Sequence, residues 1–244
     1  MNQPIAIQSW CYRNFKEIPA FIEQLKSTGV SATELCGVHA DFSKPDTFGK
    51  VIEQFKKANV QLVCIGVEYL SGNLETDRPR FEFCKQAGIK HMSISFQPES
   101  MWDGLKNIEK LAEQYDLKLS IHNHGGYDWL GNAKMLEHIF NTTSERIGLC
   151  IDTAWCLQAA QDPVEWAGKF SKRLFGVHIK DFTFDRAGKW TDVIVGTGNL
   201  KLKEFLHASL AAPHLKNATL EYEGDVNNPG PALKECVTAV HAAI

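Results

Sequence analysis

The sequence lacks the features that mark several common classes of protein. Its 244 residues include seven cysteines but no C-x-x-C pair, and the formal net charge is −3. An odd number of unpaired cysteines indicates reduced thiols and a reducing compartment rather than a disulfide framework. The acidic balance provides no basic field for nucleic acid. No apolar run approaches the roughly 18 residues that a membrane-spanning helix needs.

Two further absences narrow the class of protein that this sequence can encode. No G-x-G-x-x-G or G-K-[ST] turn follows any strand-like run, so the usual dinucleotide and nucleoside triphosphate loops are missing. A strand begins within a few residues of the N-terminus, and no signal peptide is visible. We therefore expect a cytoplasmic protein, although a leader peptide removed beforehand would leave no trace in this sequence.

What the sequence contains is a strict alternation of strands and helices. Strand-like runs are predicted at 5–10, 30–36, 61–68, 91–97, 117–126, 146–155, 173–181 and 218–225. Helical stretches are predicted at 15–27, 47–58, 74–86, 101–115, 133–140, 163–171, 200–210 and 231–244. Eight such units without a linker predict one domain, residues 1–244, folded as a single (β/α)₈ TIM barrel, for which about 250 residues are typical. A doubly wound open sheet is the alternative.

The last four strand-like runs share one pattern. Alternate residues of a strand face opposite sides, and in each run one side is bulky and apolar while the other is small and then polar. The polar positions at the C-terminal ends are His122, Asp152, His178 and Glu221. This pattern is typical of strands that line a barrel with its chemistry at the C-terminal mouth.

These four residues predict a metal site. Unpaired charges inside a barrel are costly, so Asp152 and Glu221 need a cation, and two imidazoles are good neutral donors. Such a set suits one divalent ion, Mn²⁺, Zn²⁺, Co²⁺ or Fe²⁺, better than Mg²⁺, which favours all-oxygen ligands. The alternative is a buried salt-bridge network in which Lys180 pairs with Asp152 or Glu221.

Further polar and aromatic residues fall on the same inward faces. The candidate catalytic acids and bases are Glu221, His124, Lys180 and Glu223. The candidate substrate-binding residues are Trp10, Glu34, Glu68, Gln97 and Trp155. Glu34, Glu68 and Gln97 could instead hydrogen-bond the ligand imidazoles, and the tryptophans, with Trp102 and Trp129, could simply pack at the rim. The segment 182–199 is expected to be a long loop and a candidate lid.

The motifs IHNHGG, LCIDTAW, GVHIKDF and LEYEGD, with GTGNLKLKEF, resemble those of the xylose-isomerase-like barrel superfamily over essentially the whole chain. The resemblance implies a metal held by Glu, Asp, His and Glu from strands five to eight. Asp152, His178 and Glu221 match these positions, whereas His122 replaces the first Glu. This departure weakens the symmetric two-carboxylate epimerisation known in the family, and inosose-dehydratase-like members also place histidines there.

The resemblance implies an enzyme acting on a small-molecule carbohydrate. The first expectation is a divalent-metal-dependent sugar isomerase or epimerase acting on a small keto sugar through a metal-bound enediolate. The alternative is a metal-dependent lyase, a dehydratase or hydratase, acting on a keto-cyclitol or 3-keto-glycoside. Abasic-DNA repair, as in the related endonuclease IV group, is disfavoured because Trp155 occupies one of that group's histidine positions. A non-catalytic sugar sensor is the remaining hypothesis. No nucleic-acid or membrane partner is expected, and a homodimer is compatible with the sequence.

Overall fold

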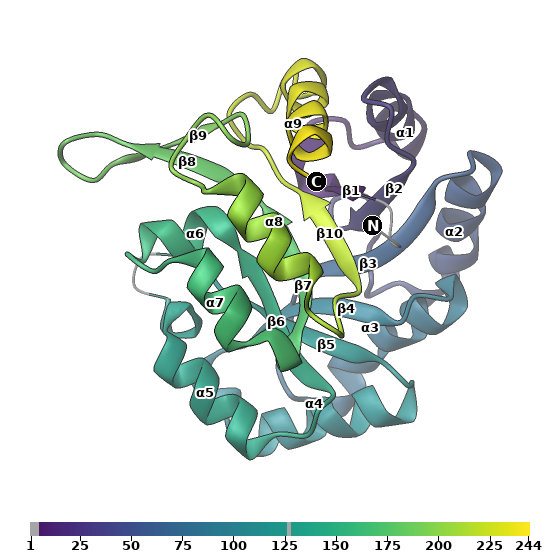
Figure 1. The fold of residues 1–244 in the computed structure, drawn as a ribbon. Coiled ribbons are helices and arrows are strands. Elements are labelled where there is room, and N and C mark those ends of the chain that lie inside the picture. Colours follow the sequence, from purple (N-terminus) through teal and green to yellow (C-terminus); the bar gives the residue numbers. More distant parts are fainter. Residues whose placement is uncertain (1–4, 126–127) are drawn as a thin grey trace.

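The computed structural model describes residues 5–125 and 128–244 and contains a closed barrel of eight parallel strands (Figure 1). The order around the barrel is β1-β10-β7-β6-β5-β4-β3-β2, with every neighbouring pair parallel wherever the register is defined. The strands are β1 Ile5–Gln8, β2 Ala32–Leu35, β3 Gln61–Tyr69, β4 His91–Ser95, β5 Lys118–His122, β6 Ile147–Asp152, β7 Leu174–Ile179 and β10 Asn217–Leu220. The predicted TIM barrel is confirmed, and the open-sheet alternative is not observed.

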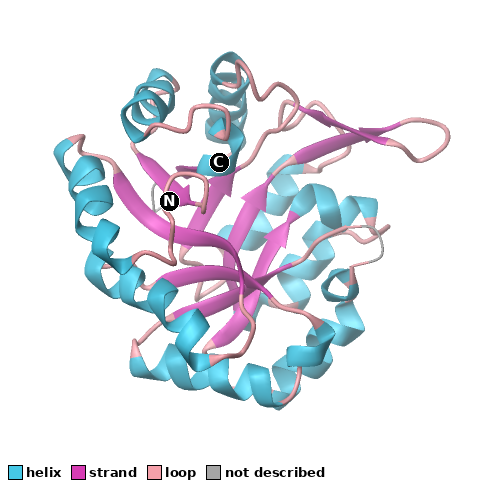
Figure 2. Ribbon diagram, turned by 180° about the vertical axis from the view of Figure 1, so that it is seen from behind, coloured by secondary structure: helices cyan, strands magenta, loops and turns pink. Residues whose placement is uncertain are grey.

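Helices cover the outside of the barrel (Figure 2). They are α1 Ile18–Ser27, α2 Phe48–Lys57, α3 Leu74–Ala87, α4 Asp103–Gln114, α5 Ala133–Thr142, α6 Thr153–Gln158, α7 Pro163–Lys169, α8 Leu202–Leu210 and α9 Gly230–Ala243. Short 3₁₀ turns lie at η1 Ser9–Tyr12, η2 Pro45–Thr47, η3 Pro98–Ser100, η4 Trp129–Gly131 and η5 Ser171–Arg173. Within the described residues, no helix combines the length and the apolar content that crossing a membrane requires.

Local chemistry sets several helix boundaries. Asn73, Asn132 and Asp162 each accept hydrogen bonds from amides in the first turn of the helix that follows, which satisfies donors that a helix start leaves free. Gly88 ends α3 in the left-handed conformation, with φ of 72°, which glycine adopts without steric cost.

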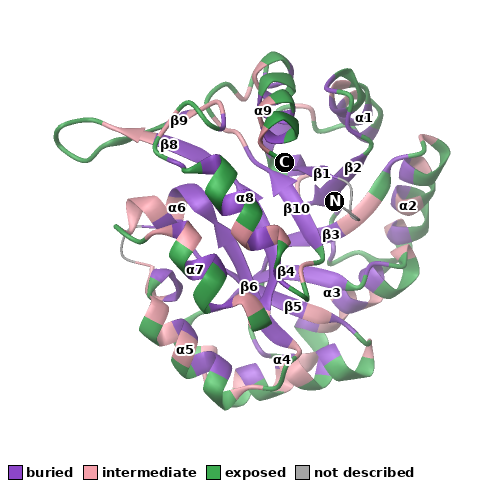
Figure 3. Cartoon of the chain, viewed as in Figure 1, coloured by how far each residue is buried: buried purple, intermediate pink, exposed green. Residues whose placement is uncertain are grey.

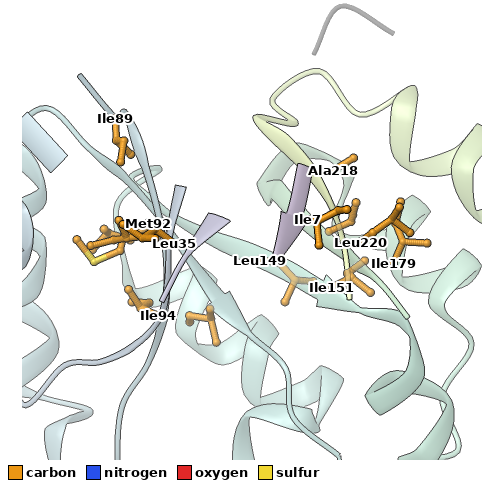
Figure 4. Close-up of a cluster of buried hydrophobic side chains, with 14 of the residues drawn as sticks. Ile7, Leu35, Ile89, Met92, Ile94, Leu149, Ile151, Ile179, Ala218 and Leu220 are labelled. Carbon is orange, nitrogen blue, oxygen red and sulfur yellow. The ribbon is translucent and has the colours of Figure 1, made fainter. Parts of the chain in front are cut away.

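The hydrophobic core lies between the barrel and the helices. Many outward-facing strand residues, among them Ile7, Met92, Leu149 and Ile179, are fully buried (Figure 4). The exposed surface lies mainly on the outer faces of the helices, on loops and on the β8–β9 region, while most residues of the barrel strands are buried (Figure 3). The apolar side chains therefore hold the shell together, and the inward positions are free to carry polar groups.

Most of the barrel strands end earlier than the sequence predicted, and two of these differences concern site residues directly. The run expected to continue to Trp155 stops at Asp152, because the Asp152 carboxylate accepts a hydrogen bond from the amide of Trp155 and begins α6. The last strand stops at Leu220, and Glu221 and Glu223 lie in the segment that follows. Trp155 therefore lies in α6, and Glu221 and Glu223 lie in the loop after β10, rather than in the strands themselves.

The expected long loop at 182–199 is partly a hairpin. Strand β8 (Asp181–Phe184) pairs antiparallel with β9 (Trp190–Val193), and the hairpin projects from the barrel in Figure 1. Trp190 stacks on Phe182 with ring centroids 4.6 Å apart. The carboxylate of Asp181 accepts hydrogen bonds from the amides of Gly196, Gly198 and Leu200, which fastens the return segment to the base of the hairpin.

Candidate active site and metal centre

The four residues predicted as metal ligands come together at the mouth of the barrel. One ligand atom from each of His122, Asp152, His178 and Glu221 lies within 4.8 Å of all the others, and all four residues are buried. Nε2 of His122 is 3.5 Å from Oδ2 of Asp152, and Nδ1 of His178 is 2.9 Å from Oε2 of Glu221. The strand register explains the meeting, since β5, β6, β7 and β10 are consecutive around the barrel.

The donors fit a divalent cation. Among the described residues, Oδ2 of Asp152 is buried and has no hydrogen-bond partner, while Oδ1 caps α6. A buried carboxylate oxygen left without a donor is expensive unless something positive faces it. Two carboxylates and two imidazoles within this radius are a suitable set for an ion such as Zn²⁺ or Mn²⁺.

His178 is oriented from below by Glu34. Oε2 of Glu34 lies 3.1 Å from Nε2 of His178 and also accepts hydrogen bonds from Asn217 and Thr219. This leaves Nδ1 of His178 facing Glu221, an arrangement common for imidazoles that bind metals. Burial acts to raise the pKa of Glu34, but the adjacent His178 outweighs it and lowers the pKa to about 2.

Lys180 is enclosed by carboxylates. Its ammonium group bonds to Glu221 at 2.8 Å, makes a short contact with Glu223 and lies 3.5 Å from Asp192 of the hairpin. Burial acts to lower the pKa of Lys180, but these carboxylates hold the pKa well above its usual value. Lys180 is 1% exposed and lies under the rings of Trp155 and Phe182.

The structure contains features of both alternatives drawn from the sequence, the metal site and the salt-bridge network. Lys180 does pair with Glu221, as the salt-bridge hypothesis expected. Burial acts to raise the pKa of Glu221, but Lys180 and then His178 bring it well below the usual range, so this carboxylate stays charged. The pairing does not satisfy Asp152, whose Oδ2 still faces the cluster without a donor from the described residues.

A cavity of about 620 Å³ opens above the cluster. It is lined by Gln8, Trp10, Cys36, Gly37, Val38, Gly66, Val67, Glu68, Tyr69, Arg80, Ser95, His122, His124, Trp155, Glu221 and Glu223. Four predicted catalytic or metal residues, His122, His124, Glu221 and Glu223, thus reach the same space. The volume suits a small molecule of one or two rings.

His124 is the exposed imidazole of this cavity. Its ring stacks on Trp155 with centroids 4.3 Å apart and planes inclined by 28°. Trp155 in turn lies over Gly125, where a β-carbon would meet the indole at 2.4 Å, so this position of the IHNHGG motif requires glycine. The partial burial of this ring, and then His122, lower the pKa of His124, which favours the neutral imidazole.

The opposite wall is built around Glu223 and Trp10. Oε2 of Glu223 accepts a hydrogen bond from Nε1 of Trp10 at 2.9 Å and pairs with Arg13 at 3.0 Å. The guanidinium of Arg13 lies over the Trp10 ring, 4.8 Å from its centroid. Trp10 is therefore held in place although it is 41% exposed.

Other predicted residues lie elsewhere. Gln97 is exposed at the start of η3 and outside the cavity lining, and Glu34 is fully buried beneath His178. Trp129 packs on Phe96, and Trp102 is exposed near His138.

Sequence reasoning missed three charged residues at the site, namely Arg13, Arg80 and Asp192. They lie outside the C-terminal ends of the barrel strands, so the alternation of inward and outward positions gave no signal for them.

Several known proteins are similar to this chain in sequence. An inosose dehydratase of Geobacillus kaustophilus is 25% identical over 174 residues, 68% of this chain and 54% of the relative. A 3-oxo-isoapionate decarboxylase of Pectobacterium atrosepticum is 29% identical over 93 residues, 36% of this chain and 33% of the relative. The chain thus spans between a third and about half of the length of these relatives.

Solved structures share the whole fold. The IOLI protein with a bound zinc atom matches with a TM-score of 0.79 at 16% identity, covering 99% of this chain and 96% of that one. The probable 3-DHS dehydratase AsbF of Bacillus anthracis matches with a TM-score of 0.77 at 14% identity, covering 98% and 99%. The sequence profile of the xylose isomerase-like TIM barrel matches residues 22–236. This chain belongs to the xylose isomerase-like TIM barrel family.

Proposed function

We propose that this protein removes water from a polyhydroxylated cyclic ketone, a keto-cyclitol or 3-keto-glycoside, by β-elimination. The observation that carries the proposal is the identity of the groups around the cluster. Glu221 is paired with Lys180, and the imidazoles of His122 and His124 stand where symmetric proton exchange would require a second carboxylate. Elimination needs no such symmetry. The dehydratase names of the relatives support this choice.

His124 is the proton-transfer group in this mechanism. A divalent cation held by His122, Asp152, His178 and Glu221 would polarise the ketone and the neighbouring hydroxyl and so acidify the C–H bond between them. Neutral His124 accepts that proton. The electrons of the C–H bond form a C=C bond while the C–O bond of the next hydroxyl breaks. The imidazolium returns the proton to the leaving oxygen, which departs as water and leaves a conjugated enone.

The remaining residues position the substrate. Glu223, fixed by Trp10 and Arg13, accepts a hydrogen bond from a ring hydroxyl. The stack of Trp155 on His124 fixes the plane of the imidazole and keeps one of its faces away from water. Lys180 holds Glu221 and Glu223 from beneath rather than touching the substrate, because it is 1% exposed.

The test is turnover of keto-cyclitols and 3-keto-glycosides by protein loaded with Mn²⁺, Co²⁺ or Zn²⁺. We expect the ultraviolet absorption of a conjugated enone to appear together with the loss of one water, read by mass spectrometry. If no compound of either class loses water with any of these ions, the dehydratase proposal is wrong.

Isomerisation or epimerisation of a keto sugar is the second candidate. Glu221 lines the cavity as well as belonging to the cluster, so a carboxylate lies beside the substrate in addition to His124. The first half of the reaction, removal of the proton next to the ketone, is the same. Incorporation of solvent deuterium into a ketose without loss of water would favour this candidate over elimination.

A further inference from the structure

An ion pair stands across the barrel from His178. Glu68 belongs to β3, which lies opposite β7 in the strand order, and Arg80 projects from α3 into the same cavity. Nε of Arg80 donates to Oε2 of Glu68 at 2.8 Å, and Nη1 donates to the carbonyl of Thr76 at 3.1 Å. The guanidinium is thus fixed at two of its three nitrogens. Among the described residues, Nη2 of Arg80 and Oε1 of Glu68 have no hydrogen-bond partner.

The cationic side chains around the cavity are already neutralised. Arg80 pairs with Glu68 at 2.8 Å, Lys180 with Glu221 at 2.8 Å, and Arg13 with Glu223 at 3.0 Å. A phosphate or carboxylate is bound by arginine or lysine whose charge is free to meet it, often in a bidentate fork. Here Glu68 occupies part of that fork. An anionic group would meet the carboxylate as well as the guanidinium.

A fixed guanidinium–carboxylate pair matches a different chemistry. The free atoms of the pair are a donor, Nη2, and an acceptor, Oε1, and a hydroxyl group can both accept and donate. Ser95 and Tyr69, which line the same part of the cavity, add two more hydroxyls. The pair therefore offers complementary partners to neighbouring hydroxyls on one ring.

We propose that Glu68 and Arg80 bind vicinal hydroxyls at the end of the substrate remote from the candidate metal cluster. The substrate is then a neutral polyol ring that carries no phosphate or carboxylate at that end. This inference rests on the proposed function for its keto-polyol class, and it adds that the compound is unphosphorylated. It assigns Arg80 as a specificity-determining residue.

The test is a binding experiment without turnover. Wild type, Glu68→Gln and Arg80→Met are titrated with myo-inositol, with myo-inositol 1-phosphate and with inorganic phosphate, and binding is followed by calorimetry or saturation-transfer NMR. We expect wild type to prefer the neutral cyclitol. Glu68→Gln should bind it about tenfold more weakly, as loss of a hydrogen bond to a charged group implies. The same variant should gain affinity for both phosphates, because Arg80 is then unpaired.

Arg80→Met provides the second variant. Its affinity for the neutral cyclitol should fall to a similar extent. Its affinity for phosphate should not rise, since this variant contains no unpaired cation in place of Arg80. Glu137→Gln is the matched control, because Glu137 makes an ion pair of the same 2.8 Å length with Lys169 on the helical shell. It should bind all three probes like wild type.

Two results would overturn the inference. The first is wild type that binds the phosphorylated cyclitol at least as tightly as the neutral one, or that binds neither. The second is Glu68→Gln that binds neutral cyclitol unchanged. Since the readout is binding, failure of the dehydratase assay leaves this result standing, and failure here leaves the elimination chemistry untouched.

Discussion

The imidazole of His124 stacks on the indole of Trp155, with ring centroids 4.3 Å apart. This contact places an exposed imidazole beside the buried cluster. His122, two residues earlier on β5, points into the cluster itself. One strand end therefore supplies both a candidate ligand and a candidate base, and the two roles can be separated by substitution.

Replacing His124 should abolish proton transfer while leaving the metal in place. We expect His124→Asn to lower turnover of a keto-polyol substrate by about 10²- to 10⁴-fold, the usual contribution of a positioned acid–base group. Bound metal per chain should be unchanged. The control is His138→Asn, because His138 is an exposed histidine on α5 whose ring contacts Trp102. Metal loss in His124→Asn would contradict the separation of roles.

Asp152 has two functions that can be tested against a matched residue. Asp152→Asn keeps a side-chain oxygen to cap α6 but removes the charge from the cluster. We expect bound Zn²⁺ or Mn²⁺, measured by elemental analysis, to fall by at least tenfold. Thermal stabilisation of wild type by the ion, about 2.7 kcal/mol at a hundredfold excess over Kd, should also disappear. Asp162→Asn, which caps α7 away from the cluster, should retain both.

The stabilisation that Glu34 gives the folded state should be lost in acid. Its pKa in the folded protein is about 2, against an ordinary value of 4.5, so the folded state is favoured while the carboxylate is ionised. That stability is present above pH 4.5 and is lost as the pH falls toward 2. We expect Glu34→Gln to unfold at lower urea concentration than wild type at pH 7. The difference should shrink at pH 3, and a constant difference would contradict this explanation.

Asp192 should have the opposite pH dependence. Burial is the main cause that raises its pKa from 3.8 to about 7, although Lys180 acts to lower it. A group whose folded pKa is raised stabilises the fold below its unfolded pKa and loses that contribution as the pH rises through the folded value. Asp192→Asn mimics the protonated form. We therefore expect it to resist urea better than wild type at pH 8 and equally at pH 4.

An Asp192→Asn protein that is less stable than wild type at pH 8 would show that the contact with Lys180 outweighs the cost of burial. Lys180→Met gives the reference for that outcome, because it leaves three carboxylates facing one another. Removing one partner of a buried ion pair typically costs about 3–5 kcal/mol. We expect Lys180→Met to be destabilised by an amount in this range.

The barrel and the four-residue cluster could be predicted from the sequence because both depend on strand periodicity. Once alternate residues face inward, the polar residues at successive strand ends must meet, and His122, Asp152, His178 and Glu221 do meet. Periodicity also placed Glu34 inside, and its contact with His178 is the one expected if His178 is a metal ligand, a role that stays a prediction.

The remainder of the site depends on side chains whose positions do not follow from the strand periodicity. Arg80 lies on a helix and reaches the cavity only because its side chain folds back along α3 to Thr76. Asp192 reaches Lys180 because the segment expected as a loop forms a hairpin. The strand period also gives no sign of the short helix α6, because it places Asp152 inside a strand, whereas Asp152 caps that helix.

The contact of Glu34 with His178 joins residues 144 positions apart, and Glu221 follows the strand that closes the barrel between β7 and β1. The ion-binding geometry therefore exists only after the last strand has docked. A cation that binds this geometry would stabilise the native state without stabilising a transition state in which that strand is still unpaired. Its effect would fall on the rate of unfolding and leave the rate of folding nearly unchanged. The ion would then increase the kinetic stability of the completed barrel.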